Sequence, residues 1–233
     1  MVEIFILVTT FIILAIGLNI KISDIKKIKA IGYDKELNKI TNKLPNNIDI
    51  CKAMLKIIKN DKVQIEKNGK SKTSFYLVMK NKIIIANIDD TFTRVQTLAH
   101  ECIHSIQNKK VLKFNHIFSN IYIIYFILIC ILIIFKIING AEIINIFFIV
   151  LIMLSLIYFS VRGFLEVDAM TRAKYLAKEY IEEEETLSED EERCIMEKYD
   201  IINKTGIKFY LFTLISGTIL KALIFCIIAI IFA

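Results

Sequence analysis

The stretch LAHECIHSIQ, residues 98–107, contains the motif His-Glu-x-x-His and decides how the rest of the chain is interpreted. On a helix, His100 and His104 lie one turn apart on the same face, so their ring nitrogens can bind one metal ion. Glu101 lies about 100° around that helix, beside the position where the metal would hold a water molecule. There it can accept the water's proton, because Zn²⁺ lowers the pKa of such a water toward about 7. The motif therefore predicts a helix over residues 91–108 that carries a zinc site.

The alternative to a metal site is a helix with two hydrogen-bonded histidines and one exposed glutamate. The chain contains only three histidines, and a sequence of this kind gives the motif by chance in roughly one chain in 400. Phe92, Val95, Leu98 and Ala99 form an apolar stripe ahead of the histidines, which predicts that the helix packs against a core. Rarity and context together favour the metal site.

The polar segment of residues 21–116, which contains the motif, predicts an α+β domain. Apolar residues repeat at helical spacing near its start, and Asn46 or Asn47 can cap a second helix. Residues 87–91 carry capping side chains for the helix of the motif. Strands are expected over residues 63–66, 74–79 and 83–86, the last two as a hairpin.

Four apolar stretches predict helices that cross a membrane, for which about 20 mostly apolar residues are needed. The hydrophobic fraction of 55% and the mean hydropathy of +0.56 are too high for an ordinary soluble domain. Lys221 near the middle of the last stretch costs roughly 3 kcal/mol of insertion energy, which the surrounding apolar residues outweigh; a break there into two half-helices is the alternative. The first stretch lacks a basic start and a cleavage site, so we expect an uncleaved anchor. The stretches are residues 5–20, 117–135, 143–161 and 209–232.

Basic residues near the ends of these stretches predict the orientation of the chain in the membrane. Lysines and arginines gather after the first and third stretches and before the second and fourth, whereas the short second connection holds only Lys136 and Glu142. Both long polar segments are therefore expected in the cytoplasm and both termini outside. The expected location is the plasma membrane, with several spans and a cytoplasmic site.

Charge and cysteine patterns argue against other classes of protein. The net charge of +6 is explained by the residues that flank the spans, and no interleaved aromatic and basic pattern of a nucleic-acid site is present. The acidic run of residues 182–192 lacks the ligand spacing of an EF-hand and is interpreted as a solvated face. Five scattered cysteines without a Cys-x-x-Cys pair indicate reduced thiols.

A catalytic zinc site takes a third protein ligand. His116 is the remaining histidine, but it lies at the start of a span, where an interfacial position is the simpler interpretation. The first carboxylates after the chain returns to the same side of the membrane are Glu166 and Asp168, and small residues beside Glu166 would allow close approach to the motif helix. Asp168 can either pair with Arg172 on the helix surface or accept a hydrogen bond from a ligating histidine.

LAHECIHSIQ resembles the zinc helix of the bacterial membrane neutral zinc metallopeptidase family (YugP-type), which reads roughly AAHExGHAxQ. FLEVDAMTRAKYL, residues 164–176, is similar to the second motif of that family, roughly PVEFDASRRAL. The order of anchor, polar segment, zinc helix, two spans, second motif and last span is also similar over most of the chain. The resemblance implies one Zn²⁺ per chain bound by His100, His104 and Glu166, with Glu101 as catalytic base and peptide bonds as substrate.

Together these observations predict a mainly α membrane protein, with four transmembrane helices and a small cytoplasmic α+β zincin-like domain. The expected function is that of a zinc-dependent endopeptidase in the lipid bilayer that hydrolyses peptides or membrane proteins near the cytoplasmic surface. The alternative is a non-catalytic zinc-stabilised scaffold or partner protein, which Glu101 disfavours because a structural zinc site needs no base. The expected order is an anchor over residues 1–20, the α+β domain over 21–116, a helical hairpin over 117–161, a helical segment with the third ligand over 162–208, and a last span over 209–233.

Overall fold

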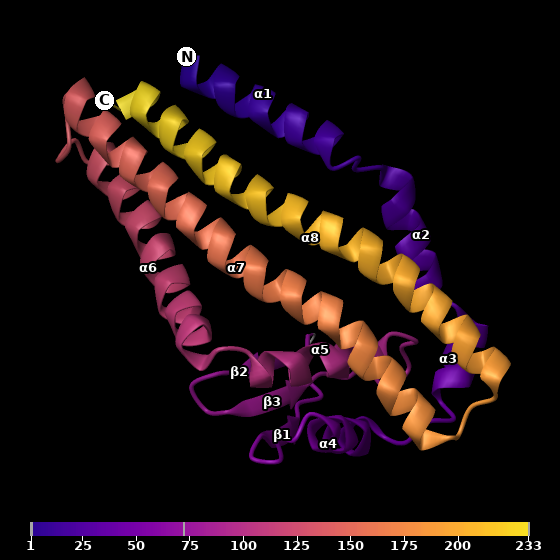
Figure 1. Cartoon of the computed structure of the whole chain (residues 1–233). Coiled ribbons are helices and arrows are strands. Elements are labelled where there is room, and N and C mark those ends of the chain that lie inside the picture. The colour runs from indigo at the N-terminus through magenta and orange to yellow at the C-terminus, as the bar shows by residue number, and fades with distance from the viewer. Residues whose placement is uncertain (1, 72, 233) are drawn as a thin grey trace. The chain divides into compact units, whose positions relative to one another are not determined.

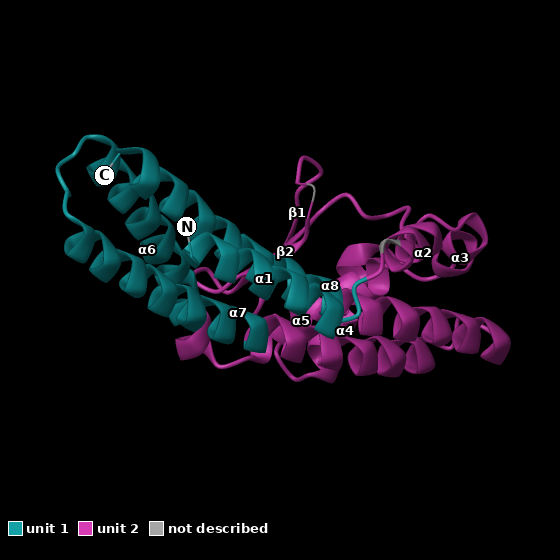
Figure 2. Ribbon diagram, turned by 90° about the horizontal axis from the view of Figure 1, so that it is seen from above, with its two compact units in different colours: residues 1–20, 113–164, 208–233 teal, residues 21–112, 165–207 magenta. Residues whose placement is uncertain are grey.

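The computed structural model describes residues 2–71 and 73–232 and divides into two compact units (Figure 2). Unit 1 comprises Met1–Ile20, Lys113–Phe164 and Lys208–Ala233, and unit 2 comprises Lys21–Leu112 and Leu165–Ile207. The chain is mainly helical, with one small sheet (Figure 1). Its elements are α1 (Val2–Gly17), α2 (Ile22–Gly32), α3 (Lys35–Thr41), α4 (Asn47–Ile57), β1 (Gln64–Lys67), β2 (Phe75–Leu77), β3 (Lys82–Ile85), α5 (Arg94–Ile106), α6 (Lys109–Ile134), α7 (Ala141–Glu184) and α8 (Glu189–Phe232).

Unit 1 contains the apolar helices. Among the described residues, α6, α7 and α8 are long and apolar enough to cross a membrane, and they contain the predicted second span up to Ile134 and the whole of the third and fourth spans. The predicted first span, residues 5–20, only overlaps α1, which has 16 residues and ends at Gly17. At 1.5 Å per residue this helix is about 24 Å long, less than the roughly 30 Å of a bilayer's hydrocarbon core. Three membrane-crossing helices are therefore supported by length and composition.

The mostly apolar interior of unit 1 contains a small polar cluster. Tyr122 of α6 is buried, and its hydroxyl lies 2.8 Å from the Ser155 hydroxyl of α7. The ammonium of Lys221 lies 5.4 Å from the centre of the Tyr122 ring, a cation–π contact, and donates to the Gly217 carbonyl at 3.3 Å. Helix α8 continues through Lys221, so the alternative of a break between two half-helices is wrong. These contacts account for a lysine in an otherwise apolar helix.

The sheet of unit 2 has the strand order β1-β3-β2. Strands β2 and β3 are antiparallel, so the predicted hairpin is confirmed, with Tyr76 opposite Ile83. Strand β1 joins the other side of β3 in parallel, with Ile65 opposite Ile83. The central position of β3 follows from its side chains, because Ile83, Ile84 and Ile85 are all buried. Strand β2 is left at the edge of the sheet.

Helices α4 and α5 pack together beside this sheet. Helix α4 begins as predicted, because the side chain of Asn46 accepts hydrogen bonds from the amides of Ile48 and Asp49. Helix α5 begins at Arg94, later than the predicted residue 91, and its N-cap Thr93 makes no side-chain cap bond. The predicted capping by residues 87–91 is therefore wrong.

The start of α5 is held by the buried side chain of Arg94, which is 4% exposed. Its guanidinium donates to the carbonyls of Thr41, Leu44 and Pro45 and to the side-chain oxygen of Asn47. These bonds attach the segment before α4 to the first turn of α5. The start of α5 is therefore fixed by the hydrogen bonds of Arg94 and not by the predicted capping side chains.

Helices α7 and α8 are each 44 residues long and uninterrupted. Helix α7 begins in the apolar segment and ends in unit 2, whereas α8 begins in unit 2 and ends in the apolar segment. Their polar parts pack on α5 within one core, to which α7 contributes Ala169, Ala173 and Tyr180. The acidic run lies at the turn between them. Ser188 and Glu191 form a reciprocal capping box at the start of α8, with hydrogen bonds of 3.1 and 3.4 Å. The run is thus a helix start with exposed carboxylates, which agrees with its interpretation as a solvated face.

Candidate metal centre

Three side chains of unit 2 converge on one point. The Nε2 atoms of His100 and His104 are 3.0 Å apart. One carboxylate oxygen of Glu166, Oε2, lies 3.3 Å from the first nitrogen and 3.7 Å from the second. This group could hold a metal ion. The structure therefore brings together the two histidines of the motif and the first carboxylate of the second motif, which are 62 residues apart in the sequence.

The spacing of these atoms fits a small tetrahedral cation. With bonds of 2.0–2.1 Å, tetrahedral ligand atoms are about 3.3–3.4 Å apart, and the three distances of 3.0, 3.3 and 3.7 Å bracket this value. Two imidazole nitrogens only 3.0 Å apart can share one proton or one cation, but they cannot both carry a proton between them. Two histidines and one carboxylate also match the donor set of catalytic zinc sites.

Local structure explains why these side chains meet. His100 and His104 are one turn apart on α5, and their rings lie edge to face with centroids 4.6 Å apart. Glu166 lies on α7, one turn before the buried Ala169 and two turns before the buried Ala173. Both alanines belong to the same core as α5, so their small side chains let α7 approach the motif helix closely, as the sequence predicted.

The ligand group is partly open to solvent. The exposed fractions of the side chains are 20% for His100, 10% for His104 and 14% for Glu166. The ligand side chains are therefore not sealed from water. A closed structural site would bury them and use a fourth protein ligand.

Glu101 lies in the same turn of α5 but is more deeply placed, at 6% exposed. Burial raises the pKa of its carboxyl group, and the charge of Glu166 adds to that effect. The charges of His100 and His104 and a hydrogen bond from the Tyr76 backbone amide act in the opposite direction but do not cancel it. Burial alone would lower the pKa of His104, but the nearby carboxylates of Glu101 and Glu166 raise it above its usual value. The edge strand β2 thus contacts the proposed base.

The second ring nitrogen of His104 is held by a residue that the sequence analysis did not single out. His104 Nδ1 lies 2.8 Å from Gln107 Oε1. The amide nitrogen of Gln107 donates to the Leu165 carbonyl at 2.8 Å and to Asp168 Oδ2 at 2.7 Å. Asp168 also pairs with Arg172 at 3.6 Å. Both interpretations of Asp168 therefore hold in part: it forms the surface pair, and it is linked to a ligand histidine through Gln107.

A signal for Gln107 was present in the sequence. The residue follows His104 by three positions, so its side chain can return to the same face of the helix. Its partners on α7 are 58 and 61 residues away, and no local pattern predicts them.

The remaining histidine, His116, is exposed on α6 in unit 1 and is not part of the ligand group of the described residues.

The cysteine inside the motif belongs to the core. Cys102 is fully buried, and its sulfur lies 3.6 Å from that of Cys51 on α4. The contact with Cys51 and burial raise the pKa of the Cys102 thiol well above its ordinary value. Both thiols are free in the structure, and a protonated, buried thiol behaves as a small apolar side chain.

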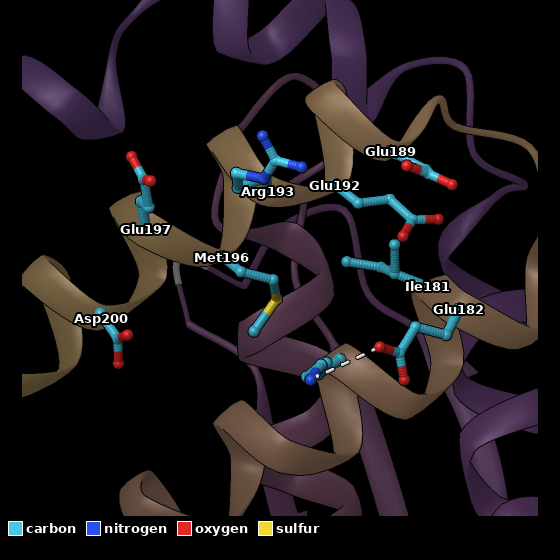
Figure 3. Close-up of a pocket in the computed structure, with 9 residues that line it drawn as sticks. Ile181, Glu182, Glu189, Glu192, Arg193, Met196, Glu197 and Asp200 are labelled. Carbon is cyan, nitrogen blue, oxygen red and sulfur yellow. Dashed lines mark ion pairs between the residues drawn. The ribbon is translucent and has the colours of Figure 1, made fainter.

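A separate cavity of about 320 Å³ lies at the turn between α7 and α8 (Figure 3). Its carboxylates are mostly exposed, and one of them, Glu182, pairs with Lys178 at 3.5 Å. None of the ligand group of the metal centre lines it. Exposed acidic side chains around a helix start are satisfied by water and by the helix dipole. The lining residues are Lys178, Ile181, Glu182, Glu189, Glu192, Arg193, Met196, Glu197 and Asp200.

Comparisons with protein-family models, with curated proteins and with solved structures find no match to this chain.

Proposed function

We propose that this protein is a membrane-embedded zinc-dependent endopeptidase. The observation that carries the proposal is the convergence of His100 and His104 of α5 with Glu166 of α7, at a spacing that suits one tetrahedral cation. The residue that follows His100 is the buried Glu101. Two histidines, one carboxylate and a neighbouring glutamate are the parts that zinc-dependent peptide hydrolysis requires.

Zn²⁺ held by these three side chains would polarise a carbonyl and lower the pKa of a water molecule toward about 7. The carboxylate of Glu101 accepts the proton that the attacking water loses. It then donates this proton to the nitrogen of the leaving amine, which is general base followed by general acid catalysis. Because Glu101 is anchored in the core and bonded by the Tyr76 amide, its carboxylate needs little reorganisation during this transfer.

The membrane part of the proposal extends the three apolar helices to four spans, with α1 as an N-terminal anchor. The basic residues that flank the apolar stretches support cytoplasmic polar segments. His104 stands about a dozen residues before the second apolar stretch, and Glu166 a few residues after the third. The proposed substrates are therefore peptides or membrane proteins whose cleavable segments lie near the cytoplasmic surface of the plasma membrane.

The test uses the full chain purified in detergent and returned to lipid. We expect it to contain about one zinc per chain and to cleave casein or a membrane protein with a flexible cytoplasmic loop. A strong chelator should abolish cleavage, and added Zn²⁺ should restore it. The variant His100→Ala should lack both metal and activity, whereas His116→Ala, which changes the histidine outside the ligand group, should retain both. A wild-type protein that contains no metal after purification and binds none on addition would refute the proposal.

A further inference from the structure

The side chain of Gln107 bridges the two halves of the metal centre. Gln107 is the C-cap residue of α5, where the extended backbone ends the helix before α6 begins. Its side chain is 93% buried, since its exposed fraction is 7%. From this position the amide meets His104 on one side and the Leu165–Asp168 segment of α7 on the other.

The partners of Gln107 permit only one orientation of its amide. The Leu165 carbonyl and the Asp168 carboxylate can only accept hydrogen bonds, so both must face the NH₂ group. The amide oxygen then faces His104 Nδ1 at 2.8 Å. Because an amide oxygen can only accept, Nδ1 must carry the proton. The Asp168 carboxylate and the Leu165 carbonyl thus determine, through Gln107, which nitrogen of His104 is protonated.

This tautomer is the one that metal binding requires. With the proton on Nδ1, the lone pair of Nε2 points toward His100 and Glu166, from which it is 3.0 and 3.7 Å away. The opposite tautomer would place a proton at the point where the three ligand atoms converge. The same amide also bonds the residue directly before Glu166, so one side chain orients a histidine ligand and holds the backbone of the carboxylate ligand.

We propose that Gln107 is a positioning residue that fixes the tautomer of His104 and keeps α7 in register with α5, so that the centre is arranged before metal enters. The inference rests on the proposed metal centre, but its first consequence concerns the metal-free chain. A carboxylate at position 107 could not replace the amide, because it would face the Asp168 carboxylate and the Leu165 carbonyl without a proton to donate. Gln107→Met, which has similar length and volume and no hydrogen-bonding amide, removes the bridge with little change in packing.

Asn60 offers a matched control. Its side-chain amide also holds the end of α5, donating to the Ser105 carbonyl at 3.2 Å and to the Ser105 hydroxyl at 2.8 Å. It contacts neither a ligand histidine nor α7 in these bonds. Asn60→Leu therefore removes two hydrogen bonds from the same helix end and should affect stability but not the tautomer of His104.

The experiment combines ¹⁵N NMR of histidine-labelled, metal-free protein in detergent, at a pH where the imidazoles are neutral, with zinc affinity from chelator competition. In the wild type and in Asn60→Leu, His104 should carry its proton on Nδ1. In Gln107→Met the signal should shift toward a mixture of tautomers, and zinc affinity should fall about 10- to 100-fold, the usual cost of losing such an outer partner.

Two outcomes would overturn the inference: a His104 tautomer that is unchanged in Gln107→Met, or a zinc affinity that falls equally in Gln107→Met and Asn60→Leu. A different result would refute the proposed function instead: the wild type shows the Nδ1 tautomer and Gln107→Met does not, yet the wild type binds no zinc. The control of the tautomer by Gln107 would then stand. The two failures are therefore distinguishable.

Discussion

Shortening Glu166 by one methylene separates the contribution of its position from that of its charge. In Glu166→Asp the negative charge remains, but the carboxylate is withdrawn toward α7 by about 1.5 Å, the length of one carbon–carbon bond. In the unchanged protein, Glu166 Oε2 lies 3.3 Å from His100 Nε2 and 3.7 Å from His104 Nε2. After withdrawal it could not come within the roughly 2.0–2.2 Å of a shared ion that a carboxylate ligand needs.

We therefore expect Glu166→Asp and Glu166→Gln to lose zinc affinity to a similar degree, by more than about 100-fold, because removing only an outer partner already costs 10- to 100-fold. Asp168→Asn should have a milder effect, since its amide oxygen can still accept from Gln107. The assay is competition with a chromophoric chelator, with metal content measured on the same samples. If Glu166→Asp or Glu166→Gln keeps the affinity of the wild type, Glu166 is not a ligand and the reasoning from the ligand spacing fails.

Two further predictions concern the fold and the orientation. Replacing Arg94 by Met leaves three buried acceptors and the partly buried Pro45 carbonyl without their donor. An unsatisfied buried acceptor costs about 1–3 kcal/mol, so unit 2 should be destabilised by about 3–5 kcal/mol; a melting temperature equal to that of the wild type would contradict this role. Reporter fusions after Lys43 and after Glu192 should both give a cytoplasmic signal, because basic residues flank the apolar stretches on that side; opposite signals from the two would exclude a shared site.

Local patterns in the sequence were sufficient for the parts of the fold that depend on neighbouring residues. The Asn46 cap, the β2–β3 hairpin and the core-facing stripe of α5 each arise from residues a few positions apart. The grouping of Glu166 with the motif histidines was also anticipated, because the predicted membrane topology restricts which carboxylates can return to the same side.

Features that depend on distant residues were not anticipated. The parallel pairing of β1 with β3 has no local signature, since the hairpin strand β2 lies between them in the sequence. Arg94, a charged residue at a helix start, is typical of an exposed position, and only the carbonyls of residues 41–45 explain its burial. Gln107 acquires its role from Leu165 and Asp168, which meet it only after α7 packs on α5.

The most direct test of the account is the activity of Glu101→Gln. This change keeps the volume of the side chain and all three ligands but removes the group that accepts a proton. We expect the variant to be folded, to contain about one zinc per chain, and to cleave substrate about 10²–10⁴ times more slowly than the wild type, the usual loss with a general base. Glu179→Gln, the same change at an exposed position on α7, is the control and should be fully active. A zinc-loaded Glu101→Gln that cleaves as fast as the wild type would contradict the assignment of Glu101 and, with it, the proposed mechanism.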